Sequence, residues 1–217
     1  MIVTQQKPFE ETLDLLKGYN KIFIIGCGEC ATVAHTGGER EALAYKAKLE
    51  ARGKEIVGFC IPQAPCISPV LKKELVKNID KIKQADAILI LSCGAGLQSL
   101  KENLGFDLII VPGCNSLFSA SVDKFSNFFE VCSNCGDCIL GKTGGICPVT
   151  RCSKNLLNGP CGGAKQGKCE IDQNRDCAWV LIYKELLKYN QLDNLKAFNK
   201  PKDHSKNFKP QKLLRKN

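Results

Sequence analysis

The segment Lys21-Ile22-Phe23-Ile24-Ile25-Gly26-Cys27-Gly28-Glu29-Cys30 joins a short apolar run to a turn of glycine and cysteine. Three later segments repeat this pattern, at residues 54–60, 86–94 and 107–114, with amphipathic stretches between them. Continuous apolar strands that alternate with helices are typical of a parallel sheet covered on both faces. We therefore predict an α/β fold: a small open parallel sheet of about four strands with flanking helices.

Two of the expected helices have recognisable starts. Thr36-Gly37-Gly38-Glu39 has the form of a capping box, and the helix that follows is expected to end near Ala51. Ser68-Pro69 places a capping hydroxyl before a proline at the first helical position. Apolar residues at helical spacing predict that this second helix continues to Ile82.

Six cysteines follow the predicted strands. In an open parallel sheet the carboxyl ends of all strands lie at one edge, where such folds bind ligands. We expect four of these cysteines to share a metal site that holds an iron–sulfur cluster or zinc: Cys27, Cys30, Cys66 and Cys93. The alternative is that the thiols are simply buried, and this suits Cys60 and Cys114 best.

The turn Gly26-Cys27-Gly28-Glu29-Cys30-Ala31 also has the form G-x-G-x-x-A of a dinucleotide-binding loop. Such sites use an acidic residue at the end of the second strand to bind the ribose. Here that strand ends in Gly58-Phe59-Cys60, without an acid. We therefore favour metal binding over nucleotide binding.

The C-terminal part of the chain has a different character. Between Cys132 and Cys169 there are many glycines and too few apolar residues to form an independent core. Metal ligation would hold such a segment together. The candidate ligands are eight cysteines: Cys132, Cys135, Cys138, Cys147, Cys152, Cys161, Cys169 and Cys177.

The spacing of these cysteines favours iron–sulfur clusters. Zinc sites usually pair two C-x-x-C units, whereas a C-x-x-C-x-x-C triplet with a distant fourth cysteine is typical of a cubane site. Eight thiols suit two [4Fe–4S] clusters, with zinc and redox-active disulfides as the alternatives. A helix beginning at Asp176-Cys177 is expected to end near Tyr189 and to pack through its apolar side chains, with Trp179 in a packing role.

Composition restricts the remaining classes of function. The chain has 217 residues and a formal charge of +9, of which residues 199–217 carry +6. This basic tail has a single aromatic residue, Phe208, and no recognised nucleic-acid-binding motif, so we expect no nucleic-acid partner. We see no membrane span or export signal and expect a cytoplasmic protein. We divide the chain into an α/β domain (1–129), a cysteine-rich module with its terminal helix (130–198) and the tail (199–217).

Four C-terminal motifs carry a resemblance to a known family: residues 132–140 (CSNCGDCIL), 144–152 (GGICPVTRC), 156–163 (LLNGPCGG) and 176–183 (DCAWVLIY). They resemble the methylenetetrahydrofolate reductase C-terminal domain, which occurs in the MetV-type small iron–sulfur subunit of two-subunit reductases. The segments 26–31 and 36–39 are also similar to that subunit.

The resemblance implies an electron-transfer subunit. The catalytic partner in such reductases is a barrel with FMN or FAD that forms methyltetrahydrofolate, and 217 residues with four strands are too few for that barrel. Electrons from ferredoxin or another carrier would pass through this chain to the partner's flavin. The alternative is a zinc-stabilised structural subunit of the same complex.

Overall fold

The computed structural model describes residues 1–214 and divides the chain into two compact units. The first contains Met1–Phe118 and Val122–Phe128, and the second contains Ser119–Ser121 and the chain from Phe129 on. Two basic residues of the predicted tail, Arg215 and Lys216, lie outside the described residues.

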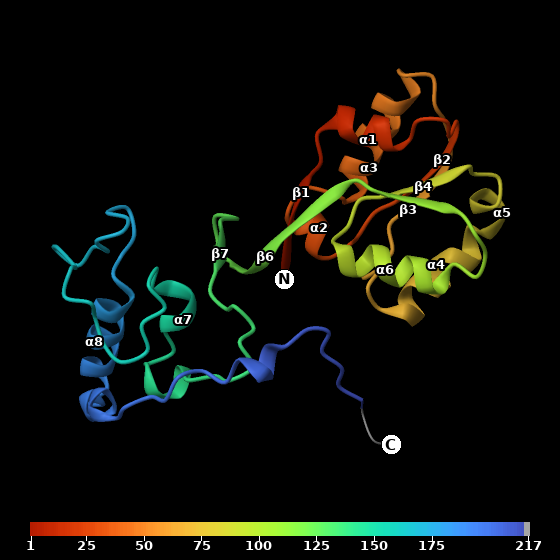
Figure 1. The fold of residues 1–217 in the computed structure, drawn as a ribbon. Coiled ribbons are helices and arrows are strands. Elements are labelled where there is room, and N and C mark those ends of the chain that lie inside the picture. Colours follow the sequence, from red (N-terminus) through yellow and green to blue (C-terminus); the bar gives the residue numbers. More distant parts are fainter. Residues whose placement is uncertain (215–217) are drawn as a thin grey trace. The chain divides into compact units, whose positions relative to one another are not determined.

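A four-stranded parallel sheet is the centre of the first unit (Figure 1). Its strand order is β3 (Glu55–Cys60), β2 (Lys21–Ile25), β4 (Ala87–Ile90) and β5 (Ile109–Pro112). At the carboxyl end of β2, Ile25 pairs with Cys60 on one side and with Ile90 on the other. The predicted α/β fold with a small parallel sheet is therefore confirmed.

Helices cover both faces of this sheet, which explains why its strands are continuously apolar. Ile22 and Ile24 of β2 point to one face and Phe23 and Ile25 to the other, and all four are fully buried. The first face packs against α3 (Glu39–Glu50) and the end of α1 (Phe9–Leu15). The second packs against α4 (Ser68–Lys77), α5 (Ile79–Ile82) and α6 (Gly94–Asn103).

Both predicted helix starts are wrong in detail. The residue that precedes α3 is Gly38, whose N–H donates to the Glu41 carboxylate at 3.1 Å. Thr36 instead hydrogen-bonds to the Thr4 hydroxyl. Ser68 is already inside α4, and its hydroxyl donates to Asn103 rather than capping the helix.

The helix predicted to reach Ile82 is interrupted. The backbone of Asn78 departs from helical geometry and separates α4 from the short α5. The Asn78 side chain donates to the Glu74 carbonyl at 2.9 Å, which satisfies an acceptor at the end of α4.

A second sheet has the strand order β1 (Ile2–Gln6), β6 (Cys114–Val122) and β7 (Phe128–Glu130). None of these strands, nor α1 and the short α2 (Cys30–Val33), stands among the sequence predictions. The segments Ile2–Gln6 and Cys114–Val122 contain many polar residues and therefore lack a continuous apolar run. These strands are recognised from their pairing in the folded chain, because their residue types alone do not predict them.

The second unit consists mainly of loops. Its regular elements are short except for the C-terminal helix: η1 (Leu140–Lys142), α7 (Pro148–Arg151), α8 (Ala178–Lys188), η2 (Leu192–Lys196) and η3 (His204–Asn207). Its core cluster contains three buried residues of α8: Trp179, Ile182 and Leu186. The predicted helix, the scarcity of core residues and the packing role of Trp179 are thus confirmed.

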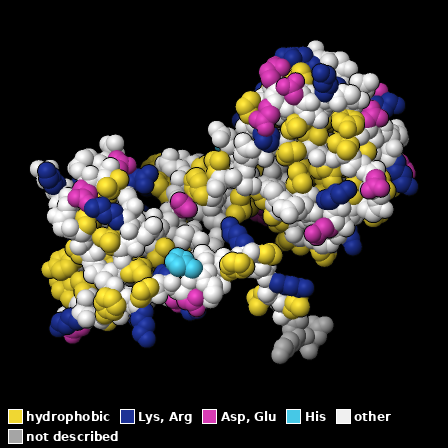
Figure 2. Space-filling view, viewed as in Figure 1, with side chains coloured by type: hydrophobic (Ala, Val, Ile, Leu, Met, Phe, Trp, Pro, Cys, Tyr) yellow, Lys and Arg dark blue, Asp and Glu magenta, His cyan; other side chains and the backbone are white. Residues whose placement is uncertain are grey.

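Within the described part of the chain, no helix has both the length and the apolar character needed to cross a bilayer. On the face drawn in Figure 2, lysine and arginine side chains of the first unit alternate with acidic ones.

Leu89 of β4 has no exposed surface and packs in the core cluster that joins the sheet to α3. Leu89→Ala should therefore lower the free energy of unfolding by about 2–5 kcal/mol, through lost burial and a residual cavity. Urea denaturation followed by circular dichroism measures this change. Val76→Ala, at a site 73% exposed on α4, is the control and should leave the transition nearly unchanged. Equal transitions for both variants would contradict this packing.

Candidate functional site

Four cysteines of the second unit line a single cavity of about 170 Å³: Cys132, Cys135, Cys138 and Cys147. The first three lie in the loop after β7, and the fourth immediately precedes α7. Asn134 adopts a left-handed backbone conformation, and its N–H donates to the Cys132 sulfur at 3.4 Å. The loop therefore brings the predicted C-x-x-C-x-x-C triplet and its distant fourth cysteine to one place.

The other four C-terminal cysteines line a second, smaller cavity of about 20 Å³: Cys152, Cys161, Cys169 and Cys177. Cys152 ends α7 and Cys177 directly precedes α8. The Cys161 thiol donates to the Glu170 carboxylate at 3.4 Å, and Lys154 forms an ion pair with the same carboxylate. Since about 20 Å³ accommodates one water-sized group, a larger group requires the walls of this cavity to move apart.

The backbone around Cys169 already favours a thiolate. The N–H groups of Ile171 and Asp172 donate to the sulfur and lower the pKa of the Cys169 thiol below its ordinary value. A deprotonated sulfur is the form that binds metals. This local geometry is therefore suited to a metal ligand.

The residues present fit a soft metal or an iron–sulfur cluster in donor type and number. Each of the fourteen cysteines is a free thiol. Two separate sets of four thiols match the ligand number of both a zinc ion and a [4Fe–4S] cluster. In the described residues, however, no group of three or more Cys, His, Asp or Glu side chains is close enough to hold a metal ion. The sets share cavities, and binding would draw their sulfurs together.

The four rim cysteines of the first unit come from three loops at the carboxyl edge of the sheet. Cys27 and Cys30 follow β2, Cys66 follows β3, and Cys93 immediately precedes α6. Strands β3 and β4 lie on opposite sides of β2, so successive strands are added first to one side of β2 and then to the other. Doubly wound sheets bind ligands at such a switch point.

Electrostatic effects link Cys27 and Cys66 each to Cys30 and Cys93. Burial raises the pKa of the Cys27 thiol, and the nearby Cys30 and Cys93 sulfurs raise this pKa further. The pKa of Cys66 is raised by partial burial and then by Cys93 and Cys30. The N–H groups of Ala31 and Glu29 oppose the increase in the pKa of Cys27. Metal binding would relieve the mutual repulsion of four such thiolates.

Cys60 and Cys114 differ from the other rim cysteines. Both are buried, in core clusters on opposite faces of the sheet. Burial raises the pKa of each thiol to about 12. As predicted for these two positions, they are core thiols.

The glycine-rich turn after β2 contacts its own chain where a dinucleotide loop would contact phosphate. The N–H groups of Gly26, Cys27 and Gly28 donate to backbone carbonyls at 2.8–2.9 Å. A β-carbon on Gly28 would lie 3.1 Å from the Cα of Gln63, so the small residue permits close packing of two loops. This use of the N–H groups agrees with the preference for metal over nucleotide binding.

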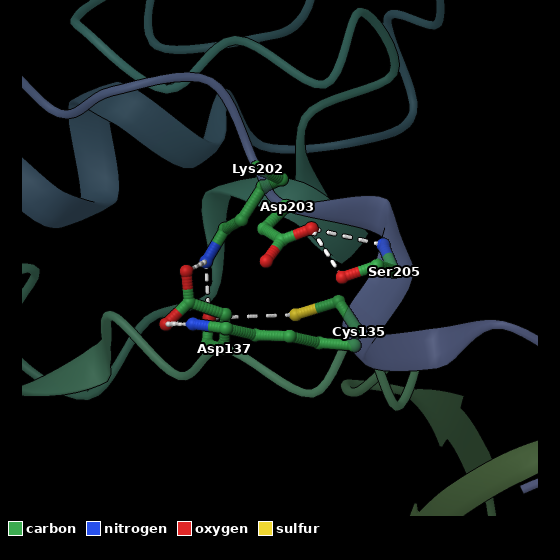
Figure 3. Close-up of polar contacts among 6 residues, drawn as sticks. Cys135, Asp137, Lys202, Asp203 and Ser205 are labelled. Atoms are coloured by element: carbon green, nitrogen blue, oxygen red, sulfur yellow. Dashed lines mark hydrogen bonds and ion pairs between the residues drawn. The ribbon is translucent and has the colours of Figure 1, made fainter.

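Sequence reasoning missed two polar residues near the first cavity, Asp137 and Lys202 (Figure 3). The Lys202 ammonium contacts the Asp137 backbone carbonyl and lines the cavity of the four cysteines. The Cys135 thiol donates to the same carbonyl at 3.6 Å. Because Lys202 is 65 positions away from Asp137, no local sequence signal marks this contact.

Comparison with known families relates the C-terminal part of the chain to methylenetetrahydrofolate reductase. Residues 111–205 match a family described as "Methylene-tetrahydrofolate reductase C terminal". This match supports a role associated with that reductase. No curated protein and no solved structure matches the chain.

The raised pKa of Cys60 and Cys114 predicts slow alkylation. At pH 8 a thiol with a pKa of about 12 has about a thousand-fold less thiolate than one with the ordinary value, and the pKa of Cys66 is raised by less than that of Cys60 or Cys114. In the metal-free, reduced chain, iodoacetamide should therefore modify the exposed Cys66 well before these two, as read by peptide mass spectrometry. Each unit of increase in pH should speed modification of Cys60 and Cys114 about tenfold. Modification of Cys60 as fast as Cys66 would contradict the assigned burial.

Proposed function

We propose that this chain is the iron–sulfur electron-transfer subunit of a methylenetetrahydrofolate reductase. It would receive single electrons from ferredoxin or another carrier and deliver them to the flavin of a catalytic partner. The observation that carries the proposal is the division of eight cysteines into two sets of four, each around its own cavity. The family match of residues 111–205 supports the assignment to this reductase.

The electron balance of the proposal is simple. Two reduced ferredoxin-class carriers each lose one electron, and the two electrons, with two protons from solvent, reduce the flavin of the partner. That flavin then reduces the methylene group of the folate to methyl. A bound [4Fe–4S] cluster supplies reversible one-electron transfer. The chain itself provides the thiolates, N–H donors such as that of Asn134, and the cavity walls.

The two sets of cysteines differ in the space that their cavities offer to a cluster. The larger cavity of Cys132, Cys135, Cys138 and Cys147 has room for a polyatomic group. The smaller cavity, beside Glu170, has room for a single ion as it stands. This difference favours a second candidate function at that position: a structural zinc ion without a redox role.

We also propose a third metal site at the rim of the first unit, formed by Cys27, Cys30, Cys66 and Cys93. Their mutual electrostatic effects and their place at the switch point of the sheet support it. Both a cluster and zinc satisfy four thiolates there.

Metal analysis after anaerobic purification tests the proposal. We expect a brown protein that absorbs near 400 nm, bleaches on reduction and recovers when mixed with an oxidised flavoprotein. About eight irons and eight sulfides per chain would leave the rim without a cluster, and about twelve of each would fill it.

Two controls sharpen this measurement. Cys60→Ala changes a core thiol and should leave the iron content unchanged, whereas Cys138→Ala should reduce it by about four per chain. Colourless protein with zinc and no labile sulfide would reject the electron-transfer function and support the structural alternative.

A further inference from the structure

The strap formed by residues 198–207 packs against the loop that carries Cys132, Cys135 and Cys138. Gly136 of this loop has φ +74°, and a β-carbon there would lie 2.6 Å from the Lys206 carbonyl oxygen. The strap ends in η3, where the Asp203 carboxylate accepts hydrogen bonds from Ser205 (Figure 3). The close approach fixes the side chains of the strap against the loop.

Lys202 is the most enclosed charge of the strap. Its side chain is 9% exposed, and its ammonium contacts both the backbone carbonyl and the carboxylate of Asp137. Lys206 approaches the same carboxylate at 3.4 Å but is 46% exposed. Two ammonium groups therefore face one carboxylate, and this group of three carries a net positive charge.

Only one of these two lysines lines the four-cysteine cavity. Lys202 does so together with Cys132, Cys135, Cys138 and Cys147. A [4Fe–4S] cluster with four thiolate ligands carries a charge of about −2, and reduction adds a further negative charge. An enclosed ammonium interacts with that charge more strongly than one exposed to screening water.

We propose that the Lys202 ammonium stabilises the reduced state of the cluster held by Cys132, Cys135, Cys138 and Cys147, and so raises the reduction potential of that cluster. The inference rests on the proposed function, because it requires a cluster at Cys132–Cys147. It goes beyond that function by assigning a side chain that tunes the potential of this one site; the second cavity has charged residues of its own in its lining, Arg151, Lys154 and Glu170.

A redox titration followed by electron paramagnetic resonance tests this role. Lys202→Gln removes the charge but keeps an N–H donor for the Asp137 carbonyl. We expect the midpoint potential of one cluster to fall while the other stays unchanged and the iron content stays full. Lys202→Arg keeps the charge and should restore the potential. Lys206→Gln is the matched control, and its exposed charge should produce a smaller shift.

The outcomes separate this inference from the proposed function. Full iron content with an unchanged potential in Lys202→Gln would overturn the role of Lys202 and leave the proposed function intact. Loss of iron from Lys202→Gln would show a structural role instead, and would also overturn the inference. A wild-type chain without clusters would reject both proposals.

Discussion

The second unit has only a small apolar core, and ligation by its eight thiols is the source of cohesion that we propose for its loops. Three buried side chains of α8 are the centre of that core, while most of the segment from Cys132 to Cys177 has no regular secondary structure. A chain that buries so little apolar surface requires another source of cohesion. Four thiols around each of two cavities provide a ligand set for that purpose.

The first unit solves a different physical problem. Apolar clusters cover both faces of its sheet, so this packing does not rely on metal ligation, and the loops at its carboxyl edge carry cysteines. Two of the six cysteines there are core residues with a strongly raised pKa, and the thiols of Cys27 and Cys66 are both influenced by Cys30 and Cys93. In each loop, the cysteine thus lies only a few residues after a buried strand that supports it.

The sequence predicts the parallel sheet because its four apolar runs are continuous, and it identifies the cysteines because their spacing is characteristic. It places the helix starts incorrectly because Thr36 and Ser68 have tertiary partners, Thr4 and Asn103, that compete for their hydroxyls. The partition of the eight thiols and the contact of Lys202 with Asp137 depend on long-range folding, which spacing alone does not reveal.

The central claim is that the C-terminal thiols form two separate four-cysteine sites that hold clusters. Native mass spectrometry of anaerobically purified Cys135→Ser and Cys161→Ser variants tests it most directly. The account predicts that each single variant carries one [4Fe–4S] mass increment fewer than the wild-type chain, and that the double variant carries two fewer. A wild-type mass that corresponds to zinc alone, or to a chain without metal, would contradict it.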